Sequence, residues 1–174
     1  MRTTHPLNVF GFCPRCGHER FQKSDKKSLR CTRCGFHLFV NAAAAVAALI
    51  SDGQGRLLLT TRGVEPDYGK LDLPGGFIDP GESAENAVVR ELDEELGLNV
   101  KSLKYMGSAP NEYIFSELSV FTLDMAFGVV PESLNGLKPM DDILEYRFYA
   151  AHEIDYSKIP APSIQLFVKQ FFQE

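Results

Sequence analysis

The sequence lacks a long hydrophobic run, a leader-like start, internal repeats and any tryptophan. None of its 174 residues belongs to an uninterrupted apolar stretch of about 18 residues, the length that crosses a bilayer, so no membrane span is expected. No apolar segment follows Arg2, which argues against a secretory signal. We therefore expect a cytoplasmic protein that does not associate with membranes.

Charge is distributed unevenly along the chain. The apolar share of 44% and the charged share of 24% are typical of a globular protein, and the net charge is −5. Residues 1–40 nevertheless contain eight lysines or arginines against two acids, whereas residues 41–174 contain ten against twenty-one. The pattern predicts a small basic module followed by an acidic domain. The basic surface either contacts nucleic-acid phosphates or, as we favour, is a solvated face that docks on the acidic domain.

Cysteine occurs only in the basic module, as two Cys-x-x-Cys pairs separated by fourteen residues. The four residues are Cys13, Cys16, Cys31 and Cys34. This spacing predicts one tetrahedral, structural Zn²⁺ site, and the glycine after each pair suits a tight turn beside the sulfurs. Two disulfides are the alternative, disfavoured because the chain shows no secretion signal, and redox catalysis is less favoured still. Residues 1–40 are therefore predicted to form a Cys₄ zinc ribbon that folds around its metal.

A turn-rich segment followed by a helix lies in the middle of the chain. Residues 74–81 hold five glycines and prolines, which no regular element accommodates. From about Ser83 the apolar residues Val89, Leu92 and Leu96 recur at helical spacing, and Gly97 is a suitable stop. The sequence therefore predicts a loop over residues 74–82 and a helix that ends at Gly97.

Three glutamates share one face of this predicted helix. Glu91, Glu94 and Glu95 lie together at 100° per residue, and like charges in this arrangement destabilise a helix. Arg90 precedes Glu94 by four residues and can balance one carboxylate, but not three. A divalent cation such as Mg²⁺ is the simplest partner for the others, because it binds carboxylate oxygens and substrate phosphates. The alternative is a solvated acidic face.

This segment resembles the signature of the Nudix hydrolases. The matching positions are Gly76, Glu82, Arg90, Glu91, Leu92, Glu94, Glu95, Gly97 and Leu98. The resemblance implies a metal-dependent pyrophosphohydrolase that uses Mg²⁺ or Mn²⁺. It also implies an α/β fold, an α/β/α sandwich around a mixed β-sheet, over residues 41–174. The remaining chain fits this architecture, with strands expected at 41–50, 56–62, 100–106, 113–130 (one bent strand or two) and 144–150, a hairpin turn at 52–55 and a helix at 163–172.

The helix geometry and the resemblance together suggest roles for individual residues. Glu91 and Glu95, one turn apart, are the expected principal metal ligands, and Glu94 is a further ligand or a partner of Arg90. Glu82 and Arg90 are expected to hold the loop on the helix. The general base is one of the signature glutamates or a more distant acid, and the sequence does not choose between them. By resemblance alone, the carbonyl of Gly75 is a further candidate ligand.

A cysteine ribbon before this domain resembles the zinc-ribbon branch of the family, typified by the NADH pyrophosphatases. By that resemblance Glu145, in Glu-Tyr-Arg-Phe-Tyr, is the distant carboxylate that joins the metal site, although it could also be a surface acid of an edge strand. The segment 160–165 resembles the start of a helix near the substrate in that branch, which makes Ser163 and Gln165 candidate substrate-binding residues.

One departure bears on the substrate. The NADH pyrophosphatases carry Ser-Gln-Pro-Trp-Pro-Phe-Pro after the signature, and this chain has Ser-Ala-Pro-Asn at positions 108–111 and no tryptophan. A preference for NADH is therefore not implied. Tyr113 and Phe115 could stack on a base, or could equally be half-buried strand residues.

Three functions remain open on the sequence alone. The first is hydrolysis of the pyrophosphate in a nucleoside diphosphate linked to another moiety, such as NADH, NAD or ADP-ribose. The second is removal of an NAD-type cap from the 5′ end of RNA, with the basic ribbon guiding the strand. The third is a non-catalytic ligand sensor, disfavoured because every signature carboxylate is kept. Many family members are homodimers, so the resemblance implies a homodimer here.

Overall fold

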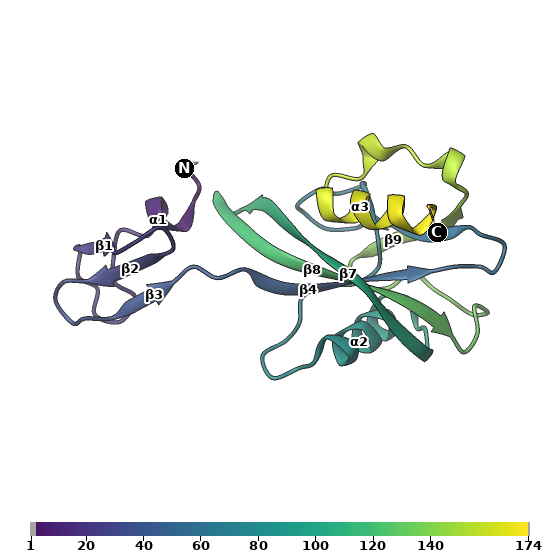
Figure 1. Cartoon of the computed structure of the whole chain (residues 1–174), viewed down its shortest axis with the longest axis horizontal. Helices are drawn as coiled ribbons and strands as arrows, with labels where there is room; N and C mark the ends of the chain where they lie inside the picture. The colour runs from purple at the N-terminus through teal and green to yellow at the C-terminus, as the bar shows by residue number, and fades with distance from the viewer. Residues whose placement is uncertain (1–2, 174) are drawn as a thin grey trace. The chain divides into compact units, whose positions relative to one another are not determined.

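The computed structural model describes residues 3–173 and divides into two compact units (Figure 1). One unit is Met1–Ala42 together with Glu112–Phe121, and the other is Ala43–Asn111 together with Thr122–Glu174. Arg2, which belongs to the predicted basic surface, lies outside the described residues. The domain limits predicted from the sequence, 1–40 and 41–174, stay a prediction.

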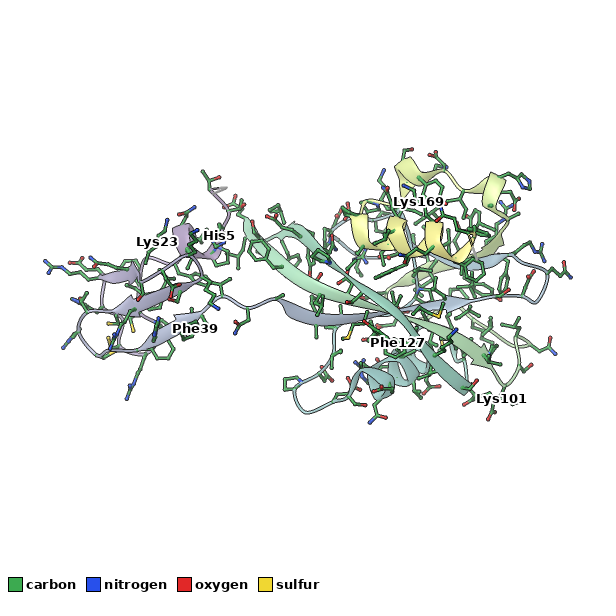
Figure 2. All side chains as sticks on the ribbon, in the orientation of Figure 1. His5, Lys23, Phe39, Lys101, Phe127 and Lys169 are labelled. Carbon is green, nitrogen blue, oxygen red and sulfur yellow. The ribbon has the colours of Figure 1, made fainter. Side chains whose placement is uncertain are left out.

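The cysteine module forms a small antiparallel sheet. Its strands are β1 (Phe21–Lys23), β2 (Ser28–Cys31) and β3 (His37–Phe39), in the order β1-β2-β3. A four-residue helix, α1 (Pro6–Val9), precedes them and was not predicted. Its N-cap residue His5, labelled in Figure 2, accepts a hydrogen bond from the amide of Leu7 through Nδ1. The core of this module is small, so the apolar residues Leu7, Phe21 and Leu29 pack around buried cysteines rather than around one another alone.

A long hairpin follows the signature helix. The chain runs from β7 (Val100–Phe115) to β8 (Leu118–Pro131) through Ser116 and Glu117, whose φ angles are 48° and 60°. The sequence predicted a strand at 100–106 and one bent strand or two over 113–130, but it did not locate this turn. Left-handed φ angles at two adjacent residues are normally found at Asn-Gly or Asp-Gly, so Ser-Glu gives no turn signal.

The strands of the second unit are divided between two three-stranded sheets. β4 (Ala43–Ile50) pairs in parallel with β8, which in turn neighbours β7. β5 (Leu57–Arg62) pairs antiparallel with both β6 (Leu71–Asp72) and β9 (Ile143–Tyr149). The predicted mixed pairing is confirmed. The turn at 52–55 also forms, but the expected β4–β5 hairpin is reduced to a bridge between Ser51 and Leu57, because the two strands enter different sheets.

Two helices cover opposite faces of the β4-β8-β7 sheet (Figure 1). α2 (Ala84–Leu96) packs on one face, where β4 contributes alternate residues such as Val46 and Ala48. α3 (Pro162–Phe171) packs on the other, against Ala47 and Leu49. Two short 3₁₀ helices, η1 (Ala151–Glu153) and η2 (Tyr156–Lys158), connect β9 to α3. The predicted α/β/α layering is confirmed.

The limits of α2 agree with the sequence, whereas its buried face differs by one residue. The Ser83 hydroxyl caps the helix by accepting from the Asn86 amide, and Gly97 ends it in a left-handed conformation. Val89 was expected in the core but is 42% exposed, and Val88 is buried in its place. The true apolar stripe therefore runs through Val88 and Leu92. Within residues 3–173, every helix is too short or too polar to cross a membrane.

Candidate active site

The loop before α2 is fixed against strand β4 by main-chain hydrogen bonds. The amide of Val46 donates to the Gly76 carbonyl at 2.9 Å, and the amide of Ala48 donates to the Pro74 carbonyl at 2.8 Å. Gly75 has φ +140°, and a Cβ there would lie 2.2 Å from the Val46 carbonyl oxygen. Glycine is required at Gly75 because the strand backbone occupies the space of a side chain.

Two carboxylates of α2 lie against consecutive residues of this loop. The amide of Gly75 donates to Glu95 Oε2 at 2.9 Å. A Cβ on Gly76 would lie 2.5 Å from Glu91 Oε1, so the Glu91 carboxylate occupies the space beside that glycine. The helix thus presents Glu91 and Glu95 to the glycine loop, one turn apart, as the spacing of the signature predicted.

Arg90 joins more acidic groups than the sequence suggested. Its guanidinium donates to Glu82 through Nε and Nη2, each at 3.0 Å, and to the Phe77 carbonyl. Its Nη1 donates to Glu91 at 2.9 Å and to Glu94 at 3.0 Å. The planar guanidinium can thus contact three carboxylates at once. One positive charge nevertheless faces three negative ones, and Glu95 is not among its partners.

Burial makes the two inner carboxylates reluctant to ionise. Burial, with smaller effects from the neighbouring Glu91 and Asp72, raises the pKa of Glu95 to about 9, although the Gly75 amide opposes this. Burial likewise raises the pKa of Glu91. By contrast, hydrogen bonds from Arg90 lower the pKa of Glu82. A bound cation would lower the pKa of both inner carboxylates, because it favours their ionised form.

This raised pKa predicts how stability depends on pH in metal-free protein. The unfolded chain ionises Glu95 near its ordinary pKa, whereas the folded chain holds the proton up to about pH 9. The Glu95 contribution to stability is therefore complete at low pH and is lost as the pH rises through that window. We expect the melting temperature without metal to fall from pH 5 to pH 9, and the Glu95→Gln variant to fall less steeply.

Thermal unfolding in a chelating buffer measures this, and about 1 kcal/mol corresponds to 2–4 °C for a chain of this size. Mg²⁺ should raise the melting temperature of the wild type more at pH 8.5 than at pH 6, because its ligands must lose their protons. Parallel pH profiles of the wild type and Glu95→Gln would contradict the assignment.

The remaining predicted site residues are placed elsewhere. Glu145 lies on β9 opposite Thr61 of β5, and its Oε1 accepts from the Thr61 hydroxyl at 3.2 Å. Glu94 is half exposed beside Arg90. Within residues 3–173, the group of three or more potential ligands that converges closely is the cysteine cluster, so neither Glu94 nor Glu145 closes a compact set with Glu91 and Glu95.

Ser163 does not have the exposure expected of a substrate-binding residue. It is 1% exposed, and its hydroxyl donates to Asp124 Oδ2 at 2.5 Å beneath α3. Its hydrogen bond therefore joins α3 to β8 inside the domain. The Gln165 amide is also engaged, donating to the carbonyls of Tyr156 and Ile159. Tyr113 and Phe115 lie near the end of β7, in the unit that contains the cysteine module. A role for these two residues in binding substrate stays a prediction.

Sequence reasoning missed two acids that affect the signature helix. Asp72 ends β6, forms a 2.9 Å ion pair with Arg62, and raises the pKa of Glu95. Asp141 also raises the pKa of Glu95, from a loop whose Met140 amide donates to the Glu95 carbonyl. The available signal for Asp72 was an acid between two apolar residues, in Leu-Asp-Leu. The residues that surround Asp72 in the fold depend on strand pairing, which this signal does not give.

The four cysteines come together in the first unit. Their sulfur atoms all lie within 4.8 Å of one another, with Cys13 and Cys34 at 3.7 Å and Cys16 and Cys31 at 3.7 Å. Four sulfurs at about 2.3 Å from a tetrahedral ion stand about 3.8 Å apart, so the spacing fits one Zn²⁺, and it is longer than the roughly 2.05 Å of a disulfide bond.

The two knuckles around these sulfurs are alike. Gly17 and Gly35 are both left-handed, and their amides donate to the carbonyls of Cys13 and Cys31. The main-chain amides of Cys34 and Arg33 lower the pKa of Cys31, whereas, against the effect of the His18 amide, burial and the neighbouring sulfurs raise the pKa of Cys16. A metal ion would favour the thiolate form of both residues.

This combination of a layered fold and a carboxylate helix clamped on a glycine loop defines a known class. The NUDIX domain model matches residues 41–169, and the chain belongs to that family. It is 32% identical over 127 residues to an NAD-capped RNA hydrolase NudC of Haemophilus influenzae, covering 72% of this chain and 48% of that protein. It is 30% identical over 155 residues to an NAD-capped RNA hydrolase NudC of Pseudomonas aeruginosa, covering 83% and 54%.

The chain thus spans about half the length of the curated relatives it matches. Among solved structures, the crystal structure of a NUDIX hydrolase from Nitrosomonas europaea is similar in fold, with a TM-score of 0.67 and 23% identity over 95% of this chain and 92% of that one.

Proposed function

We propose that this protein is a metal-dependent hydrolase that cleaves the pyrophosphate of a nucleoside diphosphate linked to another moiety, such as NAD, NADH or ADP-ribose. The observation that carries the proposal is the pair Glu91 and Glu95. Both carboxylates are held against the glycine loop, burial raises the pKa of both, and Arg90 contacts Glu91 but not Glu95. Such a pair suits Mg²⁺ or Mn²⁺ together with phosphate oxygens.

The reaction adds water across a P–O–P link, so that one P–O bond breaks and two phosphomonoesters leave. A divalent ion at this site supplies charge neutralisation on the phosphates and makes a water molecule more acidic. Glu91 and Glu95 would hold the ion, with Glu94, Glu145 or the Gly75 carbonyl as further ligands. Glu82 and Arg90 hold the loop in place, since Arg90 bridges Glu82 and the Phe77 carbonyl. One of the glutamates takes the proton of the attacking water.

A second candidate function is removal of an NAD-type cap from RNA 5′ ends. Two observations favour it: the NudC relatives are named NAD-capped RNA hydrolases, and the cysteine module carries eight basic residues against two acids. Zn²⁺ in the cysteine site would keep that module folded. On this view the basic module contacts the RNA backbone. The homodimer stays a prediction, because the structure describes one chain.

A substrate panel tests the proposal and separates the two candidates. We expect NAD, NADH or ADP-ribose to be hydrolysed to phosphomonoesters with Mg²⁺ or Mn²⁺, and no hydrolysis in EDTA. NAD-capped RNA is compared with free NAD from 50 to 200 mM salt. A steep loss of activity on the RNA alone would favour decapping guided by the basic module. Tight binding of these compounds without turnover under any metal would overturn the proposal in favour of a ligand sensor.

A further inference from the structure

A row of small side chains faces α3 along β4. Ala43, Ala45 and Ala47 alternate on that side of the strand, since Ala47 packs in the α3 core and its neighbours Val46 and Ala48 pack in the α2 core. Pairing sets Ala43 beside Thr122 and Ala45 beside Asp124 on β8. Small methyl groups therefore make up this end of the sheet face, and we call Ala43, Ala45 and Ala47 the alanine floor.

Polar side chains border this floor, and two of their atoms lack partners. Thr122 is 4% exposed, and its Oγ1 has no hydrogen bond within the part of the chain that the structure describes. The same holds for Asn111 Oδ1, which is equally shielded from solvent. Counting back through the two-residue turn at Ser116 and Glu117 places Asn111 on β7 opposite Thr122. The two atoms thus belong to one cross-strand pair.

The alternation of β8 aims Thr122 at the alanine floor. Thr122, Asp124 and Ala126 share one face of the strand, and Asp124 Oδ2 accepts a hydrogen bond from the Ser163 hydroxyl at the start of α3. Asp124 is thus satisfied, whereas Thr122 and Asn111 on the same face are not. Buried polar atoms are nearly always paired, so each exception needs an explanation, and a ligand group is one.

The polar row continues toward the glutamates of α2. Beside the effect of burial, the Asp124 carboxylate raises the pKa of Asp72. Beside the effect of burial, Asp72 in turn raises the pKa of Glu95. The main chain makes the same connection, because Ala45 forms a β-bridge with Phe77 and the Val46 amide donates to the Gly76 carbonyl, beside which the Glu91 carboxylate lies. A ligand on the alanine floor would therefore place its phosphates near Glu91 and Glu95.

We propose that the alanine floor, bordered by Asn111 and Thr122, binds a planar nitrogen heterocycle that presents an N–H donor to these two oxygens. The donor is the amino group of a nucleobase or the carboxamide of a nicotinamide. Asn111 Oδ1 only accepts and therefore selects a donor, and the Thr122 hydroxyl can accept from the same group. The inference rests on the proposed function and identifies the part of the substrate that the chain recognises.

Thr122→Val tests the proposal, because valine has the same shape but lacks the hydroxyl, and Thr122→Ser is the matched control that keeps it. In ligand-free protein we expect Thr122→Val to melt at the same or a higher temperature, since an unpaired buried hydroxyl is removed. Its dissociation constants for AMP or NMN, measured by calorimetry, should rise about tenfold, whereas Thr122→Ser should stay within about twofold of the wild type.

Substrate analogues identify the donor. If the carboxamide is read, nicotinic acid adenine dinucleotide should show a KM about tenfold above that of NAD. If the amino group is read, nicotinamide hypoxanthine dinucleotide should show that loss instead. In either case Thr122→Val should reduce the discrimination with kcat little changed.

Equal discrimination and equal AMP and NMN affinity in the wild type and Thr122→Val would overturn the proposal, and would assign the polar pair to internal hydration. AMP and NMN contain no pyrophosphate, so their binding stays informative even if the wild type hydrolyses none of the dinucleotides. That last result would overturn the proposed function and not this site.

Discussion

Replacing Glu95 with glutamine is expected to reduce kcat/KM by at least about 100-fold, with Mg²⁺ or Mn²⁺ saturating for the wild type. Loss of a group that merely supports a metal ligand costs about 10–100-fold, and Glu95 is expected to be a ligand itself. The amide side chain keeps the shape and can still accept the Gly75 hydrogen bond, so the loop should remain in place. Hydrolysis of the preferred dinucleotide, with metal titrated, measures the effect.

Glu85→Gln is the matched control for this experiment. Glu85 lies in the first turn of the same helix and is exposed, so the same chemical change should leave kcat/KM within about twofold. Metal-free Glu95→Gln should be folded and at least as stable as the wild type above pH 7, because glutamine has no buried carboxylate to ionise. Turnover by Glu95→Gln at the wild-type rate would remove Glu95 from the metal site.

Removing the metal from the cysteine cluster should unfold the first unit. The module has a small core, and zinc binding in comparable modules contributes about 10–16 kcal/mol of folding free energy. We expect Cys31→Ser to lose its single zinc equivalent and the protection of the β1-β2-β3 amides from hydrogen exchange. The amides of α2 and β4 should stay protected, because their two cores contain none of these residues.

Elemental analysis and hydrogen exchange on the full chain test this, with Thr32→Ser as the neighbouring control, since Thr32 is exposed. A strong chelator added to the wild type should reproduce the exchange pattern of Cys31→Ser. A thiol count of zero in unreduced protein, with the module still protected, would instead establish two disulfides.

Local signals were sufficient for the features that one segment determines by itself. The cap at Ser83, the stop at Gly97 and the converging cysteines all follow from the chemistry of a few neighbouring residues. The glycine loop was also predictable, although the reason for Gly75 is the Val46 carbonyl, which lies on a different strand.

Features that depend on distant pairing were missed or misjudged. The Ser116–Glu117 turn has no local signature, and β7 also runs through residues 107–112, where no strand was predicted. The burial of Ser163 follows from Asp124, which lies 39 positions away. The influence of Asp72 on Glu95 arises only when β6 and α2 meet in the folded domain. Sequence periodicity contains no information on such meetings.

The parallel pairing of β4 with β8 has a consequence for biosynthesis. One edge of β4 receives the glycine loop, and the other edge pairs with residues that the ribosome adds much later. Such long-range contacts form slowly. In the nascent chain, β4 should therefore lack its β8 partner, with only the glycine loop beside it, until β8 has left the exit tunnel. The order of translation therefore delays assembly of the carboxylate clamp until most of the chain has been made.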